Sequence, residues 1–408
     1  MDLEEALQRL YTLLSQPQTT VELKLTEAYG RVLANTVHAP LNLPPFNASA
    51  MDGYAVKRQE FLEQPDRAFE CIGESLAGHP FQGRLTDGSC VRVFTGAQVP
   101  EGADQVILQE DVLATDNRRI RFAPIELRES YVRRVGHDVT AGSILAEPGD
   151  RLHSFVCGSL ASAGIDTVTV YPLPRVGVFS TGDELVDPGT PPESLKAGQI
   201  YDSNRFTVLN LLRNTPCQTI DLGRLADDPS VVHAAFDEAS RNCDVLITSG
   251  GVSVGDADFV TDTIKSLGEL SFWRLNLKPG KPLAFGRIND CYIFGLPGNP
   301  VSTIITLLML AKPAIHYCAG YRDAQPWRVD AKLTTAVSHP PGRTEFQRGV
   351  ARMGPQGLQV SVTGDQSSNR LSTFTGANCL IEVPKDSAGL ERGENVTILP
   401  FDGLLGEA

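Results

Sequence analysis

The sequence predicts a multidomain α/β plus β fold, in which a central doubly wound α/β domain is combined with a small β-domain insertion and a C-terminal β-barrel-like domain. The chain has 408 residues, enough for roughly three domains of about 150 residues each. From residue 174 onward, apolar strand-like runs alternate with helical stretches. After about residue 324 the helical period ends and only strand-like segments follow, which predicts a separate β-domain.

The N-terminal part is expected to contain a helical region, an extended segment and a small β-domain. Residues 3–35 place apolar side chains at helical spacing. Residues 39–49 contain three prolines, which exclude a helix there. Short strands and glycine-rich turns from about 55 to 140 indicate a β-domain. The predicted domains are residues 1–50 with 140–173 (N-terminal helical and extended linker domain, discontinuous), 51–139 (small β-domain), 174–323 (α/β domain) and 324–408 (C-terminal β-domain).

The α/β region is expected to form a parallel sheet with helices on both faces. The apolar runs that we interpret as strands are residues 176–180, 244–248 and 291–294. The stretches that we interpret as helices are residues 206–212, 230–241, 258–267 and 301–317. The strands expected in the last domain are residues 329–337, 358–362, 379–383 and 395–399.

Charge and composition restrict the class of function. The net charge of −13 argues against a nucleic-acid partner, because such proteins usually carry a basic surface. An anionic substrate would then need a local cluster of Lys and Arg. The acidic N-terminus does not resemble a signal peptide. The most apolar stretch contains Lys312 and Pro313 and is too short to span a membrane, so we expect a soluble protein with no membrane partner.

The eight cysteines are not spaced as metal ligands or as a redox pair. They are Cys71, Cys90, Cys157, Cys217, Cys243, Cys291, Cys318 and Cys379. In a chain of this length they are expected to be reduced and mostly buried, which is consistent with the cytoplasm. None of the seven histidines has a metal-ligand spacing, and His137 is expected in a solvated loop.

Four loops at the ends of predicted strands are the candidate site, since ligands of such sheets bind at the carboxyl ends of the strands. They comprise residues 180–184, 248–258, 277–282 and 295–300. In the second loop, Gly250 and Gly251 would let backbone N–H groups approach an anion closely. This loop matches neither of the standard nucleotide-binding glycine motifs, and an ordinary tight turn is the alternative.

Charged residues in these loops indicate a phosphate-containing or other anionic ligand. Lys278 and Lys281 flank a Pro-Gly turn and supply a local positive cluster, unless they are two solvated lysines. Carboxylates at the strand ends suit Mg²⁺: Asp183, Glu184, Asp227, Asp228, Asp256 and Asp258. The alternative for Asp227 and Asp228, which precede a proline, is a helix cap.

Three further segments in the N-terminal part and two in the last domain carry polar residues in turn-like sequences. The last domain contains Arg343 and Arg348 near Ser367 and Ser368, and either arginine with these hydroxyls would make an oxyanion pocket. The other segments are residues 47–54, 95–97 and 135–138. Taken singly, each is also compatible with an ordinary turn.

Together these segments resemble the molybdopterin molybdenumtransferase family, to which the C-terminal domain of gephyrin is related. The match covers nearly the whole chain, and its most specific parts are residues 43–56, 249–258, 278–282 and 295–300. The resemblance implies a molybdopterin-binding α/β domain, four domains per subunit and an elongated homodimer. The implied reaction inserts molybdate into adenylylated molybdopterin with Mg²⁺-dependent release of AMP, and a molybdopterin adenylyltransferase would be the upstream partner.

The resemblance also implies roles for individual residues. Asp227 and Asp258 would act on the metal and the phosphoanhydride, and Lys278 and Lys281 would hold the anion. Ser302, Arg343 and Ser368 would complete a molybdate pocket. The pterin-nucleotide cleft would be lined by Thr181, Glu184, Asp202, Ser249, Gly250, Gly251 and Pro297. Asp52, Thr95 and Asp138 match positions tied to activity, and they would serve the site of the partner subunit.

Two positions depart from the family pattern. His137 stands where Glu is common before the aspartate, and Asp256 stands where Glu is common after Gly255. Both flank the implied site. Two other functions remain open at this level, a receptor-clustering scaffold and a metal-dependent nucleotide pyrophosphatase or adenylyltransferase, because fold alone does not fix function.

Overall fold

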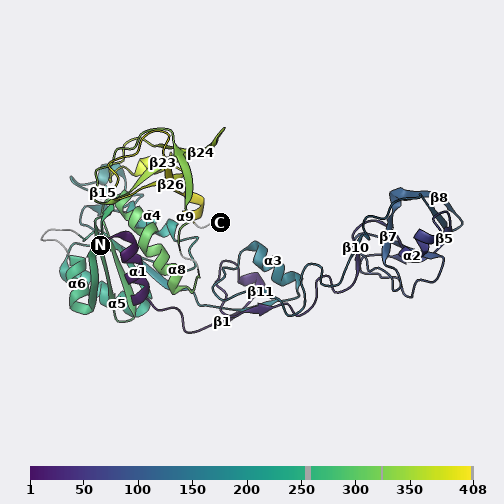
Figure 1. Ribbon diagram of the computed structural model, residues 1–408. Coiled ribbons are helices and arrows are strands. Elements are labelled where there is room, and N and C mark those ends of the chain that lie inside the picture. The colour runs from purple at the N-terminus through teal and green to yellow at the C-terminus, as the bar shows by residue number, and fades with distance from the viewer. Residues whose placement is uncertain (253–258, 323–324, 406–408) are drawn as a thin grey trace.

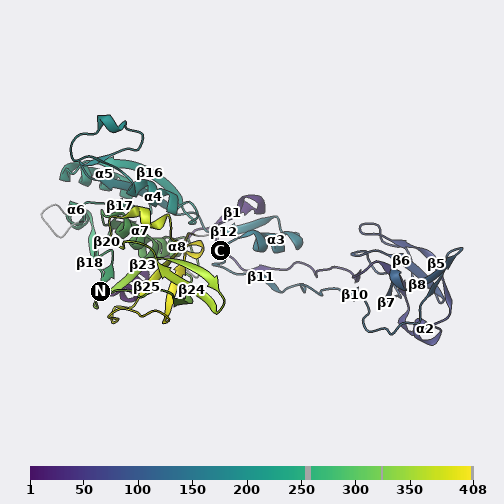
Figure 2. The same cartoon turned by 90° about the horizontal axis from the view of Figure 1, so that it is seen from above.

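The computed structural model describes residues 1–252, 259–322 and 325–405. The molecule is elongated (Figures 1 and 2). A large body contains the α/β sheet and the C-terminal strands, a smaller middle module lies beside it, and a distal β-module is joined to the middle module by two extended segments. Asp256 and Asp258 are outside the described residues.

The α/β body is built on a six-stranded sheet with the order β16-β13-β17-β21-β20-β18. Four neighbouring strands are parallel: β13 (Arg175–Thr181), β16 (Gln218–Leu225), β17 (Val245–Ser249) and β21 (Cys291–Leu296). The sequence predicts three of them, β13, β17 and β21, and it missed β16. The remaining two, β18 (Glu269–Arg274) and β20 (Pro282–Ile288), were not predicted, and they extend the sheet by antiparallel pairing. The sheet is therefore mixed.

Helices cover both faces of this sheet, which confirms the doubly wound prediction. Along β17, Val245 and Ile247 face one buried cluster and Leu246 faces the other, because successive side chains of a strand point to opposite faces. One face is covered by α5 (Pro229–Asn242) and α6 (Phe259–Leu267). The other is covered by α1 (Leu3–Leu13), α4 (Asn204–Leu211), α7 (Pro300–Thr306), the π-helical η4 (Leu307–Ala311) and α8 (Lys312–Cys318).

The continuous helical segment Pro300–Cys318 is long and apolar enough to cross a membrane, but 89% of its apolar window is buried inside the protein. It is therefore explained as the core helix of the α/β body. All eight cysteines are free thiols.

The predicted helical region at residues 3–35 is wrong beyond Leu13. Helix α1 ends there, and the chain continues as β1 (Val21–Lys24) and a 3-10 turn, η1 (Leu25–Glu27). Pro17 and the Thr-Thr-Val run that follows it disfavour continuation of the helix. Helix α1 itself buries Leu3 and Leu10 in the α/β core, although the predicted boundaries grouped it with the segment that follows.

The middle module contains two short antiparallel pairs and one helix around a core that includes Leu33, Leu152 and Leu160. Its elements are β1 with β12 (Thr167–Val170), β2 (Val37–His38) with β11 (Ile144–Ala146), and α3 (Ser154–Ser162). From this module a two-stranded ribbon leads outward through the Leu43–Val139 bridge to β3 (Ala48–Ser49), which pairs with β10 (Val132–Arg133). The proline-rich segment is extended, as predicted.

The distal β-module is a six-stranded sheet with the order β7-β4-β6-β5-β9-β8. Phe61, Phe69 and Phe122 form the centre of its core. The elements are β4 (Gly53–Val56), α2 (Arg58–Glu63), β5 (Ala68–Ser75), β6 (Ser89–Val93), β7 (Gln105–Leu108), η2 (Gln109–Asp111), β8 (Val112–Asp116) and β9 (Arg119–Phe122).

The C-terminal strands form a closed five-stranded barrel, because β23 pairs with β25 in addition to β24. The β-barrel-like prediction is confirmed. The strands are β22 (Val329–Leu333), β23 (Thr344–Gly354), β24 (Gly357–Val362), β25 (Cys379–Val383) and β26 (Asn395–Pro400), followed by α9 (Phe401–Leu405). Short elements elsewhere in the body are β14 (Leu185–Val186), η3 (Pro192–Ser194), β15 (Ile200–Tyr201), β19 (Leu277–Lys278) and η5 (Leu371–Phe374).

Candidate functional site

The described parts of the four predicted strand-end loops converge on one edge of the α/β sheet. Strands β13, β17 and β21 are parallel, so the loops that follow them leave the sheet at the same edge. Strand β18 is antiparallel to β20, which is antiparallel to β21. It therefore also ends at this edge, and residues 277–282 follow it. The arrangement is the one in which open α/β sheets bind ligands.

The glycine loop after β17 lies directly against the loop after β13. Gly250 has φ +91°, and a Cβ there would lie 2.6 Å from the carbonyl oxygen of Thr181. Its N–H donates to the carbonyl of Leu296 at 3.1 Å, which ties the loop to the end of β21. The hydroxyl of Ser249 is buried and has no hydrogen-bond partner among the described residues. Only glycine permits this approach, and Ser249 keeps a free donor at the site.

Two carboxylates from separate loops form a reciprocal pair. The N–H of Asp183 donates to Oδ2 of Asp227 at 3.3 Å, and the N–H of Asp227 donates to Oδ1 of Asp183 at 3.1 Å. Each carboxylate thus keeps one oxygen without a described partner. Hard carboxylate oxygens fit Mg²⁺, which is commonly held by one or two carboxylates plus substrate phosphates. Within the described ranges, no group of three or more His, Cys, Asp or Glu residues is placed to hold a metal alone.

The sequence left helix capping open as a role for Asp227 and Asp228, and in the structure Asp228 is the cap. Its carboxylate accepts hydrogen bonds from the N–H groups of Ser230 and Val231 and caps α5. Bonds from the Ser230 hydroxyl and from these two backbone groups lower the pKa of Asp228. The cap uses Asp228, so Asp227 remains available for another role.

Asp202 is fully buried, with 0% exposure, and is not open to a cleft in this structure. It accepts hydrogen bonds from the Ser180 hydroxyl at 2.5 Å and from Nε of Arg205 at 3.1 Å. Arg205 also pairs with Asp221 at 2.7 Å and with Asp187. The sequence did not point to Arg205, which here connects the end of β13, the start of α4 and strand β16.

The two predicted anion-holding lysines have different surroundings. The ammonium of Lys278 lies 3.0 Å from the carboxylate of Glu345, to which Nδ1 of His339 also approaches at 2.7 Å. This contact follows from parallel pairing of β19 with β23, which aligns Lys278 with Glu345. Lys281 is exposed and has no ion pair among the described residues. Lys278 is thus paired with a residue of the barrel, whereas the Lys281 ammonium is available to bind an anion.

Arg343 and Arg348, the two arginines predicted as alternatives for an oxyanion pocket, differ in burial and in hydrogen bonding. Arg348 is 0% exposed and donates to the carbonyls of Asp365, Gln366 and Ser367 and to the Thr373 hydroxyl. Its donors are occupied, so it shapes the 365–368 loop and does not bind an oxyanion. Arg343 is half-buried at the start of β23 and has no partner in the described part of the chain.

The loop that Arg348 shapes contacts the start of α7. The N–H of Val301 donates to the carbonyl of Ser368 at 3.1 Å, which brings Ser368 beside the helix that carries the buried Ser302. The loop before α7, residues 295–300, is also held by hydrogen bonds. The Thr303 hydroxyl donates to the carbonyl of Pro297 at 2.6 Å, and the Asn204 amide donates to the carbonyl of Gly298 at 2.7 Å. The barrel and the α/β domain therefore meet at this edge.

Three predicted residues are not brought to this edge within one chain. Asp52 and Thr95 lie at the distal module, where Oδ1 of Asp52 accepts from the N–H and hydroxyl of Thr95 at 2.7 and 2.8 Å. These two bonds lower the pKa of Asp52. Asp138 is exposed on the ribbon, and His137 beside it is also exposed. Figure 1 shows the ribbon and distal module well away from the α/β body.

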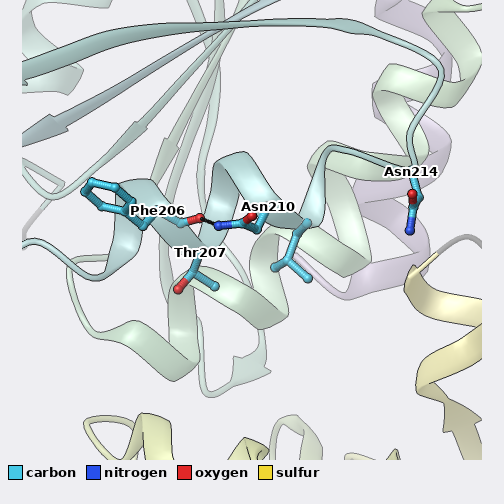
Figure 3. Close-up of a pocket in the computed structure, with 5 residues that line it drawn as sticks. Phe206, Thr207, Asn210 and Asn214 are labelled. Carbon is cyan, nitrogen blue, oxygen red and sulfur yellow. Dashed lines mark hydrogen bonds between the residues drawn. The ribbon is translucent and has the colours of Figure 1, made fainter.

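Two cavities of the described structure lie away from the polar edge. A cavity of about 440 Å³ runs along α4 and is lined by Phe206, Thr207, Asn210, Leu211 and Asn214 (Figure 3). A larger one of about 800 Å³ lies between α1 and the barrel and includes Tyr11 and Lys385. Neither of these two cavities is lined by a predicted site residue.

Comparisons with known families cover most of the chain. Residues 1–164 match the family described as "MoeA N-terminal region (domain I and II)". Residues 177–317 match "Probable molybdopterin binding domain", and residues 330–401 match "MoeA C-terminal region (domain IV)". The three matches follow the order of the middle and distal modules, the α/β domain and the barrel.

Similar proteins support the same assignment. A Haemophilus influenzae protein named molybdopterin molybdenumtransferase is 41% identical over 100% of both chains. Molybdopterin molybdenumtransferase 2 of Mycobacterium tuberculosis is 32% identical over 93% of this chain and 94% of that one. Gephyrin of Dictyostelium discoideum is 29% identical over 92% of this chain but only 58% of its own length. The crystal structure of a molybdopterin biosynthesis MoeA protein from Pyrococcus horikoshii superposes with a TM-score of 0.83, at 28% identity over 98% and 99% of the two chains.

Proposed function

The chain belongs to the MoeA family of molybdopterin molybdenumtransferases, enzymes of molybdenum cofactor biosynthesis, and we propose that it inserts molybdate into adenylylated molybdopterin with Mg²⁺-dependent release of AMP. The observation that carries this proposal is the convergence of three groups on one edge. They are the Gly250 loop, the Asp183–Asp227 pair, and the segments around Lys278 and Arg343, where β19 pairs with β23 of the barrel.

The metal belongs at the carboxylate pair. Asp227, together with Asp258, would hold Mg²⁺, and the bound ion would neutralise charge on the phosphoanhydride. Asp183 keeps Asp227 in place through the reciprocal backbone bonds. Glu184 follows Asp183 in the same loop, and its carboxylate lies so close to Gly182 that a Cβ there would be 2.5 Å from Oε2.

The remaining side chains divide between the pterin nucleotide and molybdate. Thr181, Ser249, Gly250, Gly251 and Pro297 form the backbone-rich part of the edge, which suits the nucleotide phosphates. Cationic and hydroxyl groups near the β19–β23 pairing, in α7 and in the 365–368 loop could donate hydrogen bonds to a tetrahedral oxyanion. They are Lys278, Lys281, Ser302, Arg343 and Ser368. A fixed site of this kind orients the dithiolene and the oxyanion for reaction.

The deciding experiment incubates the pure protein with adenylylated molybdopterin, Mg²⁺ and molybdate, and follows AMP and active cofactor in the same tube. We expect both products to appear together and to require molybdate and Mg²⁺. AMP formed without cofactor would instead identify a nucleotide pyrophosphatase. Tight ligand binding without either product would favour a scaffold.

The proposal includes a homodimer in which Asp52, Thr95 and Asp138 of the partner subunit complete the edge. Within one chain the distal module and the ribbon that carry these residues lie away from it (Figure 1). The middle module also exposes large apolar side chains, with Phe155 at 85%, Tyr29 at 65% and Ile144 at 54%. Contiguous exposed apolar patches mark interaction surfaces, and in the proposed dimer a second copy of the chain would cover these side chains.

Shared sites predict complementation between two inactive variants. Asp52→Ala removes the group supplied to the neighbour, and Asp227→Ala removes the group supplied to a subunit's own site. A mixed dimer then has one intact and one doubly altered site, so random reassociation of equal amounts should restore about a quarter of the wild-type activity. The measurement is cofactor formation after dissociation and mixing. No recovery in a verified mixed dimer would contradict shared sites.

The substrate of this reaction must come from an adenylylating step, so the upstream partner is a molybdopterin adenylyltransferase. The eight free thiols are consistent with a reducing compartment, and we place the reaction in the cytoplasm. A direct complex would be detected by co-purification of the two proteins in the presence of molybdopterin and ATP. Its absence under those conditions would leave diffusion as the route of transfer.

A further inference from the structure

Three ionisable side chains meet where β19 joins the barrel. The Lys278 ammonium is 3.0 Å from the carboxylate of Glu345, and Nδ1 of His339 is 2.7 Å from the same carboxylate. Glu345 is 2% exposed, and the His339 side chain is fully buried. No proposed step uses Glu345 or His339, so their arrangement needs its own explanation.

The position of the Glu345 carboxylate is fixed from two sides. A buried carboxylate is costly unless partners satisfy it, and here Lys278 and His339 provide them. The backbone adds a third constraint, because the N–H of Thr344 donates to the carbonyl of Asn276 at 3.1 Å. The carboxylate therefore cannot shift without breaking contacts in both the α/β domain and the barrel.

The buried His339 side chain makes one described hydrogen bond, to Glu345. An ionised carboxylate only accepts hydrogen bonds, so Nδ1 of His339 is the donor. Its other ring nitrogen, Nε2, is buried and has no partner among the described residues. Leaving a buried polar atom unpaired lowers stability, so the histidine is better explained by what it does to Glu345 than by stabilisation of the barrel.

We propose that Glu345 and His339 are positioning residues that hold the Lys278 ammonium in one orientation for molybdate. The inference rests on the proposed function, because it takes Lys278 to contact that anion. A free lysine side chain has many rotamers and loses them when it binds a ligand. The buried carboxylate restricts these rotamers beforehand. The pairing of Lys278 with Glu345 also fixes the ammonium relative to Arg343, which immediately precedes β23.

The KM for molybdate of the Glu345→Gln variant distinguishes a positioning role of Glu345 from a purely electrostatic one, because the two roles change the KM in opposite directions. A carboxylate next to an anion site repels the anion, so if only its charge mattered, its neutralisation would lower the KM for molybdate. If Glu345 positions Lys278, the weaker bond of the amide frees the ammonium and raises the KM. We expect a rise of about tenfold with a smaller change in kcat, by analogy with groups that orient metal ligands.

The kinetic test is a double-mutant cycle on the full-length protein. Lys278→Ala and the double variant with Glu345→Gln should have the same KM for molybdate, because Glu345 acts through Lys278. His339→Ala should raise the KM as well, and His339→Asn should recover much of it, since its amide can donate near the Nδ1 position. Glu382→Gln is the matched control: it breaks the ion pair with Arg328 in the same barrel and should leave the KM unchanged.

A labelling experiment tests the ion pair without using activity. Both Lys278 and Lys281 precede proline, so trypsin leaves them together in the peptide Leu275–Arg287, and limited acetylation can be compared within one fragment by mass spectrometry. We expect Lys278 to react several-fold more slowly than the exposed Lys281, because its ammonium is paired with the Glu345 carboxylate. Glu345→Gln should reduce this difference, and Glu382→Gln should preserve it.

The outcomes separate the inference from the proposed function. A wild-type protein that makes no cofactor would overturn the function, while the labelling ratio would still report on the ion pair. An active wild type would overturn the inference if Glu345→Gln left the KM unchanged or lowered it, if the double variant were additive, or if the two lysines reacted equally. Loss of thermal stability without a change in KM would likewise assign Glu345 a purely structural role.

Discussion

Replacing Asp227 by Asn is expected to lower the rate of AMP release about 10²- to 10³-fold at saturating substrate, the loss typical when a group that stabilises developing charge is removed. The amide retains the size of the side chain and an oxygen that can accept the N–H of Asp183. It loses the negative charge that a magnesium ion requires. The measurement is AMP release in single turnover, with a Mg²⁺ titration that should shift to higher concentration.

The neighbouring residue provides the control. Asp228→Asn makes the same chemical change one position away, but Asp228 caps α5 through Ser230 and Val231, and Asn is an equally good N-cap. AMP release and thermal stability should both remain close to wild type. Equal losses in the two variants would indicate a general effect on the loop, and an unchanged rate in Asp227→Asn would remove Asp227 from the mechanism.

Replacing Arg205 by Ala is expected to destabilise the α/β body by about 3–5 kcal/mol, the cost of removing one partner from a buried ion pair. Asp202 is completely buried and receives hydrogen bonds from the Ser180 hydroxyl, from the backbone N–H of Arg205, which alanine retains, and from the Arg205 guanidinium, which alanine lacks. Without the guanidinium, its charge and those of Asp187 and Asp221 are no longer compensated. Thermal unfolding should shift downward by roughly 6–20 °C for a unit of this size.

Arg241 offers a matched surface comparison. It pairs with Asp237 at 2.8 Å one helical turn away, and its side chain is largely exposed. Such pairs contribute only about 0.3–0.5 kcal/mol, so Arg241→Ala should barely change the unfolding temperature. A similarly small effect in Arg205→Ala would show that the three carboxylates do not depend on the guanidinium.

The sequence predicts those parts of the fold that local patterns encode. The apolar runs at β13, β17 and β21 and the helices between them follow directly from periodicity, and so does the convergence of loops at one sheet edge. Strands β18 and β20 were missed, because their place in the sheet depends on antiparallel pairing of β20 with β21 and of β18 with β20. Strand β23 was missed because Glu345 and Arg348, both buried within it, interrupt the expected apolar alternation.

The candidate site was predictable in composition but not in contacts. The loop containing Gly250 and the lysines around the Pro-Gly turn are visible as local motifs. The bond between Asp183 and Asp227 joins residues 44 positions apart, and the Lys278–Glu345 pair joins residues 67 positions apart. Such contacts depend on the tertiary arrangement, so the sequence cannot indicate which of two adjacent aspartates caps a helix or which of two lysines is held.

The ribbon between the middle and distal modules has a mechanical consequence. If one chain segment joined the modules, the distal module could rotate freely about the connection. Here two segments are joined at the Leu43–Val139 bridge and by β3–β10 pairing, and this ribbon resists torsion about its long axis. Bending across the thin direction of the ribbon remains easier than twisting. Movement of the distal module is therefore expected to be hinge-like, so that Asp52 sweeps along an arc with its orientation about the ribbon axis largely preserved.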